Sequence, residues 1–523
     1  MTGQLLRKTL KILAISIVAI LGVLFLIMLY FNSTPGQKRL SNLIFNRLSK
    51  QIGTPVEGRL SFSIPDWVRL EDLLLRDQTK DTLLYAQRAH LDVGLWKLFN
   101  NELLIEQVEL ENAFVQLKKK DKKFNFDYLL EAFSSDTPSA PADTSKTPLQ
   151  ITLSGIDLKQ IRVNYTDEDI DQQFRVRLGH LVSGLHELDL QNSIFDLKDT
   201  EITGLTVLGK LGTASTDTSA SGPLPQVKIK SLLAKDLNWD LDLGEQQTSG
   251  AKAQVALQVK DLDLPNMAFE IASLKADAET LRFSQKNAPA VPQGEINYSD
   301  LSLSELALTA ENVLVQDSVM ALDLKTLRAK EQSGIVIENL SGQASLKGQT
   351  ALLENIALKT PGSALKATGT LQIDSTAFMK SKLDVVIPEL KVAVKEAFYF
   401  ASSLKQTLPK SHQDVLTGKG RIRGSIQDMQ LDHVYLTATA NTRVTLDGSL
   451  HFGEVFGLNM KVKDFSTTPQ DLSKYVTLPD SMRLPEQMVV NGNVSGNMEN
   501  LVAEVFLNSS YGGALKRESE GIV

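Results

Sequence analysis

From Val56 onward, apolar and polar residues alternate with a period of two. In residues 365–373, Leu365, Leu371 and Ile373 occupy alternate positions, with Lys366 and Thr370 between them. This period is typical of a β-strand that buries only one face. Most of residues 56–510 are therefore predicted to form antiparallel strands, which recur about every ten residues.

Two further stretches, 253–259 and 444–452, show the same alternation. Their apolar residues and those of 365–373 are the candidates for the lining of one apolar face. The candidate residues are Val255, Leu257, Val259, Leu365, Leu371, Ile373, Val444, Leu446, Leu450 and Phe452.

Helices are predicted in only three short segments of the body. In the first, Thr34 is the expected N-cap, Leu40, Leu43, Ile44 and Leu48 follow at three- and four-residue spacing, and Gly53 ends the helix. This amphipathic helix is expected at a membrane surface. The others span residues 391–408 and 470–475.

So few helices cannot cover the apolar face of so many strands. An uncovered apolar face is unstable in water, and a second layer normally covers it. Two solutions are open: the sheet closes on itself as a sandwich or barrel, or it curls around an apolar guest that is not protein.

The N-terminus predicts a membrane anchor. Arg7, Lys8 and Lys11 precede an uncharged stretch from Ile12 to Phe31, which has about the 20 residues that a transmembrane helix needs. The stretch ends in aromatic residues, without the small residues of a signal-peptide cleavage site. The basic flank keeps the N-terminus in the cytoplasm, so the body is exported.

Composition excludes several function classes. The net charge of −7 argues against nucleic-acid binding, and the absence of cysteine excludes disulfides and thiolate sites. No catalytic, nucleotide-binding or metal-binding signature is present, so an enzyme, a cofactor and a metal site are not expected. A tethered hydrolase is the least favoured hypothesis.

Two charged runs have competing interpretations. The basic run 118–123 (KKKDKK) is a hairpin turn or a contact to anionic headgroups. The acidic run 167–171 (DEDID) has the spacing of calcium ligands, but it lacks the turn glycine and the last glutamate of such a loop, and a solvated turn is favoured.

The order of motifs resembles that of the AsmA-like and TamB family of bacterial envelope proteins. An anchor is followed by a helix that opens with TPGQ, by a strand leading into WVRLEDLLLRD, and by later segments in the same order. These segments are 34–37 (TPGQ), 67–77 (WVRLEDLLLRD), 81–86 (DTLLYA), 103–112 (LLIEQVELEN), 124–126 (FNF), 478–486 (LPDSMRLPE) and 490–492 (VNG).

The resemblance implies a mainly β fold: an elongated, curled antiparallel sheet with a U-shaped groove, after one transmembrane helix. It implies a protein of the inner membrane with a periplasmic body, which carries phospholipid to the outer membrane and supports outer-membrane integrity. An alternative that it also implies is a scaffold for the insertion of outer-membrane β-barrel proteins, which would then be partners.

The expected domains follow from these features. They are a cytoplasmic tip and anchor (1–33), a membrane-proximal AsmA-like segment (34–133), a disordered linker (134–148), an elongated β-groove (149–510) and an irregular tail (511–523). Residues 212–225 form a second expected loop. Because TamB proteins are usually longer, the tail suggests truncation, with a short family member as the competing explanation.

Overall fold

The fold is described from a computed structural model. It describes residues 26, 29–30, 32–63, 67–94, 102–133, 150–189, 194–212, 226–263, 265–287, 289–375, 377–400, 413–439, 441–452, 456–473, 485–497, 500–509 and 514–521. Two units are distinguished, residues 1–244 and 245–523. Each is an open, mainly β structure and is described by itself.

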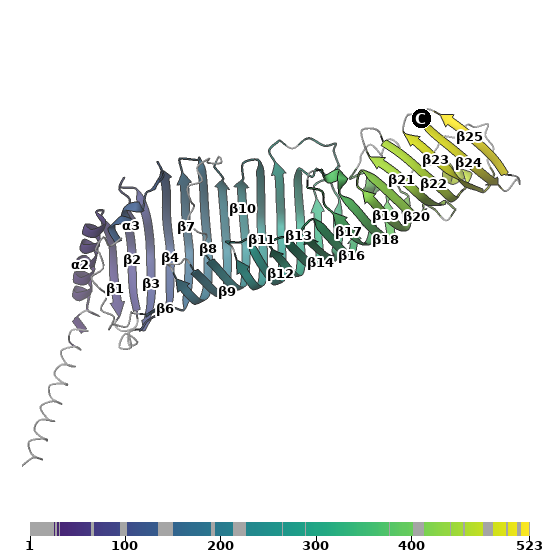
Figure 1. The fold of residues 1–523 in the computed structure, drawn as a ribbon. Coiled ribbons are helices and arrows are strands. Elements are labelled where there is room, and N and C mark those ends of the chain that lie inside the picture. The colour runs from purple at the N-terminus through teal and green to yellow at the C-terminus, as the bar shows by residue number, and fades with distance from the viewer. Residues whose placement is uncertain are drawn as a thin grey trace, which may run out of the picture. The chain divides into compact units, whose positions relative to one another are not determined.

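The first unit is a sheet with two helices. The helices are α2 (Thr34–Ile52) and α3 (Asp127–Phe133). The strands are β1 (Val56–Ser63), β2 (Trp67–Arg76), β3 (Thr82–Gly94), β4 (Glu102–Lys120), β5 (Lys123–Phe124), β6 (Gln150–Leu153), β7 (Gly155–Asp167), β8 (Gln172–Asp189), β9 (Ile194–Lys210) and β10 (Gln226–Asp242). The long strands lie in chain order beside α2 (Figure 1).

Three described pairs in this unit are parallel: β4 with β6, β4 with β7, and β9 with β10. The other pairs are antiparallel. A parallel neighbour needs a connection that returns to the starting end of the strand, so it cannot be a tight hairpin. The two loops expected from composition are these connections; apart from Gly212, they lie outside the described residues.

The second unit is an antiparallel meander in which each described strand pairs with the next in sequence. Its strands are β11 (Gln246–Asp263), β12 (Ala268–Gln285), β13 (Asp300–Gln316), β14 (Val319–Glu331), β15 (Val336–Lys347), β16 (Thr350–Lys359), β17 (Ala364–Gln372), β18 (Lys382–Ala393), β19 (Val415–Ser425), β20 (Asp428–Thr437), β21 (Arg443–Phe452), β22 (Phe456–Thr467), β23 (Met488–Asn497), β24 (Leu501–Ser509) and β25 (Ala514–Gly521). Its short helices are η2 (Phe378–Lys380), α4 (Val394–Ala397) and α6 (Pro469–Leu472).

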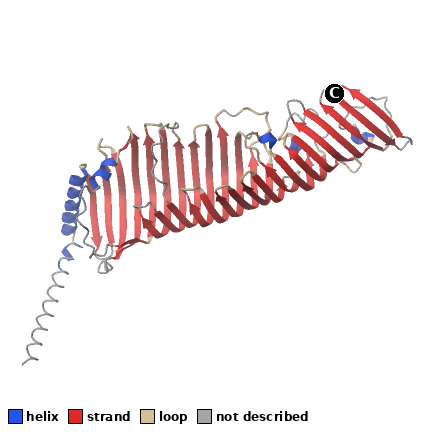
Figure 2. Cartoon of the chain, in the orientation of Figure 1, coloured by secondary structure: helices blue, strands red, loops and turns tan. Residues whose placement is uncertain are grey.

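A line of strand residues with positive φ bends the sheet of the first unit. The line includes Asp72, Asn112 and Gln160, each within a strand at φ between 50° and 55°. Such residues form bulges that bend a strand and increase its twist. Asn112 also donates to the Gln87 side chain on the adjacent strand, 2.8 Å away. The long strands therefore bend along their length, as Figure 2 shows, and the sheet curls.

The inside of the bend is lined by small side chains. Ala86 and Ala113 lie opposite each other beside the bulges and are almost inaccessible to water. Ala253, Ala278 and Ala329 are also buried in the second unit. Ala86 and Ala113 pack with Ile161 and with leucines of the neighbouring strands, so a larger residue at either position would overpack this cluster.

Helix α2 covers the outer edge of β1. It begins after Ser33, with a proline in its first turn, and ends at the left-handed Gly53 as predicted; Ser33, and not Thr34, is the N-cap. The hydroxyls of Ser41 and Ser49 accept the N–H groups of Leu60 and Val56, at 3.1 and 2.9 Å. These groups would otherwise remain open to pairing with another strand.

The structure differs from the sequence-based expectations for the two later helices and for the C-terminal tail. The helix expected over 391–408 is a single turn, α4, with residues 401–412 outside the described part. The one expected over 470–475 begins at Pro469 and ends at Leu472. The expected irregular tail is wrong for residues 514–521, which form β25 against β24.

The predicted membrane span lies almost entirely outside the described residues. Of Ile12–Phe31 only Leu26, Leu29 and Tyr30 are placed. Among the helices that the structure describes, none combines the length and the apolar character needed to cross a membrane.

The packing of α2 is tested by Phe45→Ala. The Phe45 ring packs where a side chain at Gly58 would stand, and only 8% of the residue is exposed. Its removal should lower the free energy of unfolding by about 3 kcal/mol. Urea denaturation followed by tryptophan fluorescence reports on this unit, because Trp67, Trp96 and Trp239 all belong to it.

The matched control is Leu43→Ala on the same helix. Leu43 is 63% exposed, so its truncation should change stability by less than about 0.5 kcal/mol. Equal losses for the two variants would contradict the packing of α2 on β1.

Candidate functional site: the apolar face of the sheet

The register of the strands aligns apolar residues into rows that run across the sheet. Residues directly opposite each other on neighbouring strands point to the same face. Following the pairs from strand to strand therefore identifies which side chains share a face.

Row 1 crosses the second unit from β11 to β21 and contains nothing but apolar residues and one glycine. In strand order it consists of Val255, Ala276, Leu308, Leu327, Leu340, Leu358, Leu365, Leu390, Gly418, Leu436 and Val444. At ~4.8 Å between strands, such a row is about 50 Å long.

Two further rows, row 2 and row 3, lie on the same face. Row 3 reaches from β11 to β24. It consists of Leu262, Phe269, Val315, Met320, Leu346, Ala351, Leu371, Leu383, Gly424, Met429, Leu450, Leu458, Gly496 and Leu501. Between rows 1 and 3 lies row 2, which is Leu322, Ala344, Leu353, Gly369, Val385, Ile422, Leu431, Gly448, Met460, Val494 and Ala503.

The opposite face of the same strands is polar. Between rows 2 and 3, one line of paired residues reads Thr370, Asp384, Arg423, Gln430, Ser449, Asn459 and Ser495. Ion pairs tie its strands together, among them Arg421 with Asp384 (2.6 Å) and Arg423 with Asp432 (2.7 Å). The sheet is therefore two-sided, with one apolar and one charged surface.

The apolar side chains of the rows are mostly only partly buried, with Met460 of row 2 as a buried exception. Every member of row 1 is half-buried, as are Leu371 and Leu450 of row 3. A second protein layer would bury such residues completely, as in a sandwich core. Among the described residues, the largest side chains that are buried almost completely are instead polar: Asp167, Ser381, Ser466 and Thr467. The sheet is open, and within the described part of the chain no second sheet faces its apolar rows.

The first unit has the same construction, except near α3. A row crosses it from β1 to β10: Val56, Leu75, Leu84, Val115, Val163, Val176, Val207 and Trp239. At its start, Tyr128 of α3 packs on Leu75 and Leu83, and all three are buried. Helix α3 thus covers the apolar face beside β2 and β3, whereas Val163, Val176 and Val207 stay half-buried.

The predicted lining residues come together on this apolar face. Val255, Leu365 and Val444, far apart in sequence, lie on row 1, and Leu371 and Leu450 lie on row 3. Leu257 and Val259 alternate with Val255 in β11, and Leu446 lies between Val434 and Val462. Ile373 follows the end of β17. Phe452 closes β21 beside Phe456, with 41% of its surface exposed.

Most members of the rows were not identified from the sequence. Leu308, Leu327, Leu340 and Leu390 each belong to a strand with apolar residues at alternate positions. That alternation was the available signal, but bulges shift its phase within β13 and β14. The partners across the sheet could not be assigned without the register.

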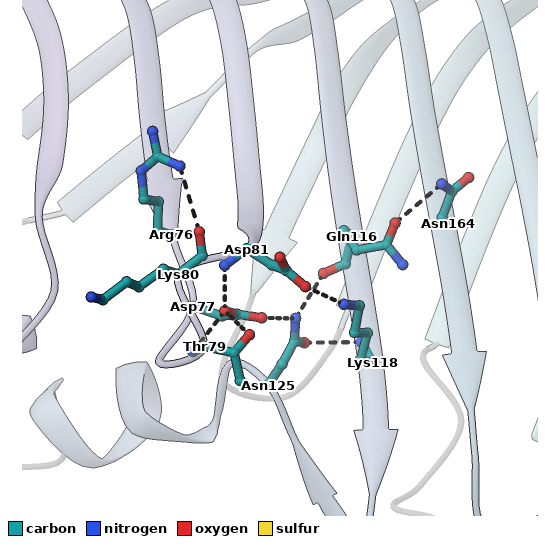
Figure 3. Close-up of polar contacts among 9 residues, drawn as sticks. All are labelled: Arg76, Asp77, Thr79, Lys80, Asp81, Gln116, Lys118, Asn125 and Asn164. Carbon is teal, nitrogen blue, oxygen red and sulfur yellow. Dashed lines mark hydrogen bonds and ion pairs between the residues drawn. The ribbon is translucent and has the colours of Figure 1, made fainter.

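Several of the N-terminal motifs have a common structural role. Three of these segments meet at the carboxylate of Asp77, which is almost completely buried (Figure 3). It accepts the N–H and hydroxyl of Thr79 at 2.9 and 2.6 Å, and the N–H of Asp81 at 3.0 Å. Asn125 donates to it at 3.2 Å.

The same cluster joins three strands. The Asn125 amide oxygen accepts the N–H of Lys118, and its amide nitrogen donates to the carbonyl of Gln116. The Lys118 ammonium lies 2.6 Å from Asp81. The β2–β3 turn is thus fastened to the end of β4, so these motif residues position the start of the sheet.

The two charged runs pair with each other at the ends of β4 and β7. Lys119 meets Asp167 and Lys120 meets Glu168, each at 3.0 Å. Backbone N–H groups of the basic turn also donate to Asp169. The basic run forms the predicted hairpin turn, and its lysines Lys118, Lys119 and Lys120 have ion-pair partners within the protein. Asp167 itself is buried, contrary to the expected solvated turn.

Among the described histidines and carboxylates, no cluster of three or more has the geometry to hold a metal ion. His180 lies beside Asp157 at 2.8 Å, and His451 beside Asp428. These are single pairs across neighbouring strands.

Comparison with known families agrees with the motif order. Residues 24–237 match the family described as TamB, N-terminal domain. This match supports the assignment of the chain to the TamB/AsmA-like family. The match spans most of the first unit and includes every residue of the Asp77 cluster, so the cluster lies in the TamB N-terminal domain. No curated protein and no solved structure matches the chain.

The Asp77 cluster gives a pH-dependent stability. Burial raises the pKa of Asp77, but the hydrogen bonds from Thr79, Asn125 and the Asp81 backbone outweigh it and hold the pKa below 3.8. A carboxyl whose pKa is lowered by folding contributes stability above its ordinary pKa and loses it as the pH falls through the folded value. The native protein should therefore lose stability as the pH falls below about 4.

Asp77→Asn should remove part of this pH dependence of stability. It should also lower the free energy of unfolding by about 1–3 kcal/mol at pH 7, because an amide cannot accept all four hydrogen bonds. Urea denaturation at pH 7 and pH 3 measures both effects, with Asp121→Asn in the nearby turn as control. A pH dependence identical to that of the native protein would contradict this role for Asp77.

Proposed function

We propose that this protein is an envelope protein, anchored in the inner membrane, whose periplasmic sheet carries phospholipid toward the outer membrane. The observation that supports it best is the set of continuous, half-buried apolar rows on one face of an open sheet. The TamB-family domain and the open sheet fit a bridge-like envelope protein.

Physical chemistry explains how such a face would carry lipid without catalysing a reaction. Each CH₂ group removed from water contributes ~0.8 kcal/mol, so an acyl chain gains several kcal/mol by lying along a row. Row 1 is longer than the ~30 Å hydrocarbon core of a bilayer. An acyl chain could therefore move from one strand to the next while its contacts are replaced by similar ones.

The polar face has a complementary part in this proposal. Cross-strand ion pairs such as Lys366 with Glu389 (2.7 Å) hold neighbouring strands together from outside. Exposed pairs contribute little stability each, but they keep that face hydrated. Headgroups would stay in water at the open side while the acyl chains contact the rows.

The proposal is tested by lipid extraction and mass spectrometry of the full chain, purified in a detergent that does not resemble phospholipid. Phospholipid should co-purify with the native protein. Leu371→Asp places a charge in row 3 and should reduce the bound lipid severalfold, since an unpaired charge on an apolar contact is costly.

Thr370→Asp is the matched control, because Thr370 precedes Leu371 in β17 and is exposed on the polar face. It adds the same charge and should leave the bound lipid unchanged. Equal lipid loss in the two variants, or a folded native protein without lipid, would argue against lipid carriage.

A scaffold for outer-membrane β-barrel insertion is the second candidate, and one observation favours it. Strand β25 pairs with β24, and no other described strand pairs with its second edge. A free strand edge can add a strand from another protein.

If the protein is such a scaffold, photocrosslinkers in β25 should capture unfolded barrel proteins in the cell, whereas those at Leu365 should not. Crosslinks to lipid alone, at both positions, would exclude the scaffold.

A further inference from the structure

Helix α2 has a second face that its packing on β1 leaves in water. With 100° per residue, Ser41, Phe45 and Ser49 point toward β1, whereas Arg39, Leu43 and Lys50 point away from it. Arg39, Leu43, Asn46, Arg47 and Lys50 are all exposed. This set is called the outer face of α2.

The charge on this helix is entirely positive. Residues 34–52 contain Lys38, Arg39, Arg47 and Lys50 and no aspartate or glutamate. None of these four has an ion-pair partner among the described residues. Several exposed cations of the sheet are paired instead, for example Arg88 with Glu111 at 2.9 Å and Lys235 with Glu201 at 3.0 Å.

Apolar residues accompany the cations. Leu43 is 63% exposed and Ile44 37% exposed, although both lie within a helix that has a protein partner. A basic helix with exposed aliphatic residues and no acidic ones fits the interface of a membrane, where the cations meet headgroups and the aliphatic chains enter the acyl boundary. An acidic protein would satisfy the cations but would not account for Leu43.

We propose that the outer face of α2 binds anionic phospholipid headgroups at the surface of the membrane. The apolar stretch 12–31 immediately precedes α2 in sequence, which places the helix beside the membrane if that stretch is the anchor. The outer face is separate from the apolar rows, so this surface does not require that lipid be carried.

Docking through this face would fix the orientation of the first unit. Ser41, Phe45 and Ser49 hold α2 against β1, so a helix lying on the headgroup layer keeps the β1 edge next to that layer. The row that begins at Val56 then starts beside the lipid. In this arrangement α2 is an adapter between the membrane surface and the sheet.

The test uses a spin label on the outer face, in the full chain reconstituted into vesicles. The protein contains no cysteine, so Asn46→Cys provides a single labelling site. Collisions of the label with oxygen, which concentrates in lipid, and with a water-soluble nickel chelate are compared between phosphatidylcholine vesicles and vesicles that also contain phosphatidylglycerol. Anionic vesicles should increase the oxygen collisions and decrease the nickel collisions.

Neutralising the cations should reverse this change. Each cation near an anionic surface shifts binding roughly fivefold, so Arg39→Gln, Arg47→Gln and Lys50→Gln together should lower the docked-to-free ratio roughly a hundredfold. Arg39→Lys with Arg47→Lys keeps the charge and should keep the docking. Removing the same number of charges from exposed strand positions, by Lys228→Gln, Lys230→Gln and Lys275→Gln, should have no effect.

Three results would overturn the proposal. They are equal accessibility in neutral and anionic vesicles, docking that persists in the neutralised variant, and a label that stays in water on vesicles while position 46 crosslinks to a protein in native membranes. The last result would assign the outer face of α2 to a protein partner.

Discussion

The structure depends on an apolar sheet face that the described part of the protein leaves largely uncovered, except where α3 packs beside β2 and β3. A strand that alternates strictly must place half of its side chains on each face, and here one of these halves is leucine, valine and isoleucine. Leu365 and Leu390 have neighbours within the sheet but no layer above them. The stability of the sheet must come from neighbouring strands, and the remaining apolar surface is available to something else.

The bulges turn this exposed face into the inside of a curl. Residues such as Asp72 and Asn112 adopt positive φ at modest cost because their short polar side chains hydrogen-bond locally. Alanines such as Ala113 are buried against the neighbouring strands beside the bulges. Curling shields the apolar rows partly from water, whereas the outer surface, which carries the ion pairs, remains hydrated. One arrangement thus satisfies both faces.

The mainly β fold could be predicted because it follows from a period of two within single strands. The same period explains why the candidate residues of one strand share a face, whereas their contact with a guest stays a prediction. The sequence could not predict the rows, since these depend on register, which bulges set. Strands were expected about every ten residues, but β4 has 19 residues and β11 has 18. A bulge such as that at Asn112 shifts the alternation, so one long bent strand resembles two short ones in the sequence.

The remaining errors have similar causes. Leu43 and Ile44 were grouped with Leu40 and Leu48 on one apolar helix face, but the hydroxyls of Ser41 and Ser49 turn α2 so that Phe45 points inward. The order of the N-terminal motifs revealed the family, yet the meeting of Asp77 with Asn125 required the fold. Local spacing cannot show which distant polar groups satisfy one another.

The central claim is that one face of each strand contacts acyl chains. It is tested most directly by photocrosslinkers placed singly along β17 of the full chain in living cells. The account predicts phospholipid adducts at positions 365, 367, 369 and 371 and none at 366, 368, 370 and 372. Adducts without alternation, or adducts only to protein at the inward positions, would contradict it.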